Sequence, residues 1–205
     1  MNNKPITIFF QGVSFLFNPF LIPTLGLWVL YHQIPGTEFY SSKVRLILFL
    51  IYFLSTCFFP LLFIVLYAVS PGGKRNLDHH RDRIVPYLFT AFSVFLGAQL
   101  TDRLPLPGIF RIFLLGISLI VVLSLLISLR WKISGHLSAI GGLTGVLIGM
   151  NFRFGMELTG WIIGAIVVSG LLGSARIFLG KHSPAQVYAG YALGLACMLL
   201  LFSLI

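Results

Sequence analysis

The sequence predicts an all-α integral membrane protein, a polytopic bundle of about six to seven transmembrane helices that forms one domain over residues 1–205. The chain is 58% hydrophobic and only 9% charged, whereas soluble domains carry about 25% charged residues. Its mean hydropathy is +0.98. Apolar runs near the length that a helix needs to cross a bilayer follow one another along nearly the whole chain. They leave no room for a separate soluble domain.

Seven apolar runs account for this prediction. Pro19 and Pro23 interrupt the first run, so we expect it to kink or to begin later. One run could also be re-entrant or lie along the membrane interface, since the runs vary in length. The runs cover residues 6–31, 44–70, 84–100, 110–129, 137–150, 158–179 and 184–205.

Glycines recur at four-residue spacing in the last three runs. Such a pattern places the glycines on one helix face, where neighbouring backbones can approach closely. We therefore expect tight helix packing at Gly141, Gly145 and Gly149, at Gly160 and Gly164, and at Gly190 and Gly194.

The charge balance is basic, with 14 Lys and Arg against 5 Asp and Glu and a net charge of +9. In a membrane protein this indicates either anionic headgroups as ligands or basic cytoplasmic loops. Nucleic acid is not expected as a partner because no soluble basic face exists to present to it. Cys57 and Cys197 lie inside apolar runs and are expected to be packing residues, not a disulfide.

Three polar clusters, at residues 74–83, 134–136 and 176–186, are separated by pairs of apolar runs. Two crossings return a chain to its starting side, so the three clusters share one side of the membrane if every run crosses. Arg, Lys and His between membrane helices are costly to place and mark function by default. We therefore expect a single site.

The last cluster carries the most specific chemistry. Arg176 can donate two parallel hydrogen bonds to a phosphate, and the His182 imidazole can attack phosphorus or exchange a proton. The spacing Arg176, five residues, His182, three residues, Gln186 resembles the third motif of the type 2 phosphatidic acid phosphatases (the PAP2 superfamily), S-R-x5-H-x3-D. Ala175 separates Ser174 from the arginine, and Gln186 stands where the family has Asp.

The other two clusters resemble the remaining motifs of the family less closely. Ser134, Gly135 and His136 match the second motif, P-S-G-H, with isoleucine in place of the proline. Lys74 and Arg81 have the spacing of the first motif, K-x6-R-P, but Asp82 follows instead of proline. Arg83 with Pro86 is a second possible alignment, and a solvated basic loop is the other interpretation of this cluster. The resemblance covers residues 74–194, the expected catalytic core.

This resemblance implies a phosphatase that hydrolyses a lipid phosphate monoester or an isoprenyl diphosphate without a metal or other cofactor. His182 would form a phosphohistidine, and His136 would protonate the leaving oxygen and then activate water. The groups implied to hold the phosphoryl oxygens are Arg176, Lys74, Arg81, Arg83, Ser134 and Gly135.

Gln186 has two interpretations. It can close a capping box with Ser183, ahead of Pro184 at the first helical position. It can also orient His182, although a glutamine carbonyl cannot stabilise the imidazolium by charge as the family's Asp does. This departure leaves open a catalytically weak lipid-phosphate binding protein, and a lipid phosphotransferase on the same scaffold is a further alternative.

A metal site is not expected. Asp78, His79, His80 and Asp82 are almost contiguous, so their side chains diverge, and no Asp or Glu accompanies the second and third motifs. The expected location is the bacterial inner membrane. The side stays open, because the count of basic residues favours the cytoplasm whereas the resemblance implies the outer side.

Overall fold

The computed structural model describes residues 4–70 and 80–204, which form helices and connecting segments with no β-strand among them. Within these residues, six helical segments are long and apolar enough to cross a bilayer: Ser42–Val69, Ile84–Thr101, Ile109–Ser128, Gly135–Phe154, Thr159–Phe178 and Pro184–Leu204. The predicted all-α transmembrane bundle is therefore confirmed, with the lower of the two expected helix counts.

The first apolar run does not form one span. It breaks into α1 (Lys4–Leu16) and α2 (Ile22–Gln33), of 13 and 12 residues. Pro19 disfavours helical geometry at Asn18, and Asn18 instead caps the break. Its side-chain oxygen accepts from the Phe20 amide at 3.1 Å, and its carbonyl accepts from the Leu21 amide at 2.9 Å.

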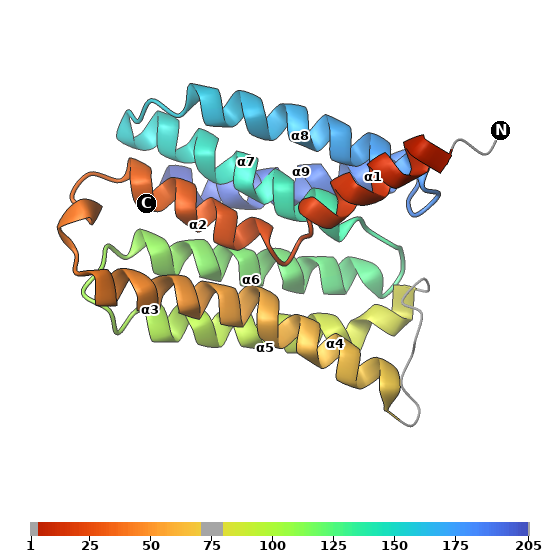
Figure 1. Ribbon diagram of the computed structural model, residues 1–205, viewed down its shortest axis with the longest axis horizontal. Helices are drawn as coiled ribbons and strands as arrows, with labels where there is room; N and C mark the ends of the chain where they lie inside the picture. Colours follow the sequence, from red (N-terminus) through yellow and green to blue (C-terminus); the bar gives the residue numbers. More distant parts are fainter. Residues whose placement is uncertain (1–3, 71–79, 205) are drawn as a thin grey trace. The chain divides into compact units, whose positions relative to one another are not determined.

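The chain forms two compact units (Figure 1). One consists of Met1–Ile22 and Lys132–Ile205, and the other of Pro23–Trp131. The first contains α1, α7 (Gly135–Phe154), α8 (Thr159–Phe178) and α9 (Pro184–Leu204). The second contains α2 after its first residue, α3 (Ser42–Phe53), α4 (Phe59–Val69), α5 (Ile84–Thr101) and α6 (Ile109–Ser128), with 3-10 turns at Thr37–Phe39 and His80–Arg83.

In the second unit, polar side chains of the membrane helices donate to backbone carbonyls. The Tyr52 hydroxyl donates to the Phe110 carbonyl, and Ser93 Oγ donates to the Ser55 carbonyl at 2.9 Å. Such bonds satisfy polar groups that hydrocarbon cannot. A π-helical turn at Leu54–Phe58 joins α3 to α4 just before Pro60, where a regular helix would lose a backbone hydrogen bond.

In the first unit, glycines bring α7 and α9 into backbone contact. A Cβ atom added at Gly145 would lie 2.5 Å from the Leu195 carbonyl oxygen, and one at Gly190 would lie 2.6 Å from the Ser134 carbonyl oxygen. Only glycine permits this approach. The predicted close packing is confirmed here, and the same kind of contact is made by Gly141, Gly149 and Gly194.

The same prediction is wrong for Gly160 and Gly164. No described atom lies within 4 Å of a Cβ placed at either position. Both glycines lie on an exposed face of α8, so their spacing does not serve packing within the described chain.

Helix α1 belongs to this unit through apolar contacts. It packs against α8, and the Phe10 and Phe178 rings lie 4.8 Å apart between centroids. Together with α7 and α9, these helices enclose a small core. The core consists of Val13, Ile22, Leu137, Ile140, Leu172, Ala175 and Val187.

Candidate functional site

The connection between α8 and α9 is a tight turn that fixes Arg176 and His182 relative to each other. Gly180 adopts a left-handed conformation with φ 63°. Its amide donates to the Ile177 carbonyl at 3.0 Å, and the Lys181 amide donates to the Arg176 carbonyl at 3.1 Å. This pair of bonds is a Schellman motif, which ends a helix and reverses the chain. The His182 amide also donates to the Arg176 carbonyl, at 3.3 Å.

The turn places a cation and an imidazole at the same end of the unit. Arg176 is half-buried in the last turn of α8, where the helix dipole favours a positive charge. The His182 side chain is only 7% exposed. Water therefore has little access to this imidazole, and its role as a nucleophile stays a prediction.

Gln186 closes a capping box at the start of α9. Its side-chain oxygen accepts from the Ser183 amide at 3.1 Å, and the Gln186 amide donates to Ser183 Oγ at 3.4 Å. This reciprocal pair is the capping alternative that the sequence left open. The side-chain hydrogen bond of Gln186 thus goes to Ser183, and an orienting role toward His182 stays a prediction.

The second motif lies directly beside the third. The Ser134 amide donates to the Gln186 carbonyl at 3.3 Å, so these two clusters meet at one end of the unit. A single site formed with the first cluster stays a prediction. Ser134 is fully buried at the N-cap of α7, and its hydroxyl has no hydrogen-bond partner among the described residues. Such a hydroxyl costs about 1–3 kcal/mol. With Gly135 opening α7, it marks the helix end where main-chain amides favour a phosphate.

His136 is held by α1. Its Nε2 lies 3.2 Å from the Ser14 carbonyl oxygen and, as the protonated nitrogen, donates to it. Ser14 is in the last turn of α1, where carbonyl groups lack partners within the helix. This contact positions the imidazole from a helix far away in the sequence, and the motifs alone did not predict it.

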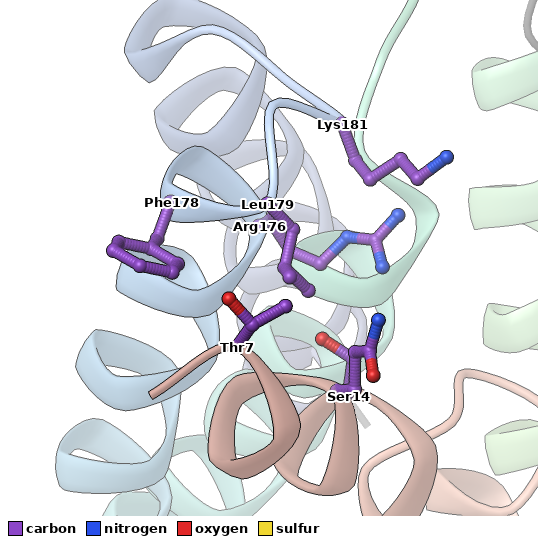
Figure 2. Close-up of a pocket in the computed structure, with 7 residues that line it drawn as sticks. Thr7, Ser14, Arg176, Phe178, Leu179 and Lys181 are labelled. Carbon is purple, nitrogen blue, oxygen red and sulfur yellow. The ribbon is translucent and has the colours of Figure 1, made fainter. Parts of the chain in front are cut away.

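A pocket of about 440 Å³ opens between α1 and the end of α8. Figure 2 shows Thr7 and Ser14 extending from α1 on the side of Arg176. Two of the lining side chains are cationic and none is acidic, so the pocket suits an anion with an apolar part. The lining residues are Thr7, Gln11 and Ser14 from α1, with Arg176, Phe178, Leu179 and Lys181.

Sequence reasoning missed the contribution of α1 to this pocket. Thr7, Gln11 and Ser14 are four and three residues apart, which places them on one face of a helix. That polar spacing inside an apolar run was the available signal. Lys181 lies within the third cluster but was not assigned a role.

The structure describes only part of the first motif. Lys74 lies outside the described residues, and so does the side chain of Arg81. Arg83 is half-buried at the N-cap of α5, within the unit Pro23–Trp131. The predicted contacts of these three residues with a phosphate stay predictions.

Within residues 4–70 and 80–204, no three His, Cys, Asp or Glu side chains are grouped so that they could hold a metal ion. The site just described instead offers cationic side chains, hydroxyls and main-chain amides. These are groups that bind a phosphate directly.

Comparison of the chain with protein-family models, curated proteins and solved structures found no match. The resemblance to the PAP2 superfamily therefore rests on the motif residues. What the structure adds is that the residues of two of these motifs, distant in sequence, lie side by side.

Proposed function

We propose that this chain is a membrane phosphatase that hydrolyses a lipid phosphate monoester or an isoprenyl diphosphate through a phosphohistidine, without a metal ion. One observation carries the proposal. The N-terminus of α7, with the buried hydroxyl of Ser134, adjoins the turn that holds Arg176 and His182, through the bond from the Ser134 amide to the Gln186 carbonyl.

In the first step, an imidazole nitrogen of His182 attacks phosphorus and the bond to the leaving oxygen breaks. His136 gives that oxygen a proton, so that an alcohol or a lipid monophosphate departs. Arg176 stabilises the negative charge on the phosphoryl oxygens, with Ser134 and the Gly135 amide as further donors.

In the second step, water attacks the phosphohistidine. His136 takes a proton from this water, the bond between nitrogen and phosphorus breaks, and inorganic phosphate leaves with His182 restored. The contact of His136 with the Ser14 carbonyl holds its ring in place through both steps. Splitting the displacement in two lets one imidazole act as acid and then as base.

The substrate is amphiphilic because the pocket is. Arg176 and Lys181 attract the phosphate, whereas Phe178 and Leu179 offer apolar contact on the same pocket. The described part of the chain carries six helices long and apolar enough to cross a bilayer, so a lipid can keep its tail in the membrane while its head enters the pocket.

The test is phosphate release from a panel of lipid phosphates by detergent-purified protein in the presence of EDTA. We expect the native protein to release phosphate and His182→Ala to release none. The control is His32→Ala, which changes a histidine on α2 that contacts the Trp28 carbonyl. Equal release by native protein and His182→Ala would refute the proposed nucleophile.

A second candidate, a lipid-phosphate binding protein, is favoured by the capping box that engages Gln186. The two are separated by rapid quenching of the protein with a phosphate-labelled lipid. A phosphatase leaves an acid-labile label on His182, whereas a binding protein leaves none. Transfer of the label to an added lipid alcohol instead of water would identify a phosphotransferase.

A further inference from the structure

The face of α1 that lines the pocket is polar, whereas most other side chains of the helix are apolar. Thr7, Gln11 and Ser14 share this face. The remaining surface of α1 exposes large hydrophobic side chains, namely Ile6, Ile8, Phe9, Phe15 and Leu16.

Hydrogen-bonding groups from α1 and positive charges from the α8 end line the same pocket (Figure 2). Ser14 is only 8% exposed, and its hydroxyl makes no hydrogen bond within the described part of the chain. Arg176 and Lys181 also line the cavity, with no carboxylate among the lining residues. A ligand rich in oxygen atoms, with a negative charge, satisfies both sets of groups.

The pocket is larger than a phosphoryl group. Its volume is about 440 Å³, whereas five heavy atoms fill on the order of 100 Å³ if each takes somewhat less than the share of one water molecule. Space for a further polar group therefore lies beside a phosphate bound at Arg176. The α1 side chains are the groups that would contact it.

We propose that Thr7, Gln11 and Ser14 bind the polar head of a phosphorylated amphiphile, beside the phosphoryl group held by Arg176 and Lys181, and so determine which head group is accepted. The ligand is a phosphate ester with hydroxyl or ester oxygens near phosphorus. The inference rests on the proposed function for the reaction, but binding of the head does not require turnover.

Binding is measured by calorimetry with the full-length His182→Ala protein, so that no probe is consumed. The probes are glycerol 3-phosphate, inorganic phosphate, and phosphatidic acid in phosphatidylcholine nanodiscs. Adding Gln11→Leu or Ser14→Ala should weaken binding of both phosphate esters about three- to tenfold, the effect of one lost hydrogen bond between neutral groups. Inorganic phosphate should bind with less than a twofold change.

The control variants change the same residue types elsewhere. Ser169 is 7% exposed on α8, and its hydroxyl donates to the Ala165 carbonyl. Gln99 lies on α5 and is half-buried. Ser169→Ala and Gln99→Leu, each added to His182→Ala, should bind every probe as His182→Ala alone does. Gln11→Glu is a second test at an exposed position, because its carboxylate should repel all three probes.

The same data show whether the ligand is a free phosphate ester or a lipid. Glycerol 3-phosphate binding alone shows that the head suffices, whereas binding of phosphatidic acid only shows that the apolar wall is also required. Either result, with the expected dependence on Gln11 and Ser14, supports the proposal. Unchanged ester binding by Gln11→Leu and Ser14→Ala, or no binding of any probe by His182→Ala alone, would overturn it.

Failure of this inference and failure of the proposed function give different results. If the native protein releases phosphate and substitutions at Gln11 and Ser14 do not change that release, the head-group site on α1 is refuted and the proposed phosphatase stands. If ester binding depends on Gln11 and Ser14 but the native protein releases no phosphate, the head-group site on α1 stands and the proposed phosphatase is refuted.

Discussion

The His182 amide donates a hydrogen bond of 3.3 Å to the carbonyl oxygen of Arg176, the same oxygen that accepts from the Lys181 amide at 3.1 Å. The five residues between Arg176 and His182 are thus the number needed to finish α8, pass through the left-handed Gly180 and turn back. The spacing of the motif has a main-chain cause. Side-chain changes at either residue should leave the turn intact.

Arg176→Lys is expected to reduce kcat/KM for phosphate release about 10- to 100-fold. Lysine keeps the charge but loses the fork of donors that matches phosphate, and a hydrogen bond to a charged group contributes about 1.5–3 kcal/mol. Arg176→Ala should lose nearly all turnover and bind phosphate more weakly. Both are measured by steady-state phosphate release, with thermal unfolding in detergent to show that the fold survives. Wild-type turnover by Arg176→Ala would remove the residue from the site.

Gly180→Ala is expected to destabilise the protein by about 1–2 kcal/mol, the cost of a left-handed conformation for an L-residue. A Cβ at Gly180 has no atom within 4 Å, so crowding cannot explain the loss. Turnover should also fall, because relaxation of the turn moves His182 away from Arg176. The measurement is the melting temperature together with phosphate release.

Gly170→Ala is the matched control for Gly180→Ala. Gly170 lies within α8, also has open space at its Cβ position, and has ordinary helical geometry. Alanine favours a helix over glycine by about 1 kcal/mol, so this variant should melt at or above the native temperature. Equal melting of the two variants would contradict the argument from backbone conformation.

The apolar runs predicted most of the fold because a membrane helix can be recognised from the length and composition of its own segment. The capping box was equally local, since Ser183, Pro184 and Gln186 are adjacent in sequence. The role of α1 could not be predicted in this way. Pro19 signalled a break, but no local pattern states that Ser14 will meet His136, 122 residues away.

Variants of Gln186 separate its two roles. Gln186→Ala should lower stability by about 1 kcal/mol, because it removes the acceptor of the Ser183 amide. Gln186→Glu keeps the capping box and adds a negative charge at the N-terminus of α9, so stability should be equal or higher. Unfolding in detergent measures both effects.

Gln186→Asp addresses catalysis. We expect phosphate release to rise, because a carboxylate four residues after His182 can stabilise the imidazolium that forms in the reaction, as in other histidine-based catalysts. Release and melting are measured on the same preparation. Unchanged or lower release at native stability would assign Gln186 to the capping box alone.

Gly190→Ala is expected to damage stability and turnover together. The added Cβ would lie 2.6 Å from the Ser134 carbonyl oxygen and 3.3 Å from Ser138 Oγ. The carbonyl belongs to the backbone that starts α7, so relief requires α7 and α9 to separate, at about 1–3 kcal/mol for an overpacked contact. Separation also stretches the bond from the Ser134 amide to the Gln186 carbonyl, which joins the two motifs. Gly164→Ala, at an open position within α8, should melt at or above the native temperature and release phosphate as the native protein does. The same result for Gly190→Ala would show that the two motifs do not depend on this helix contact.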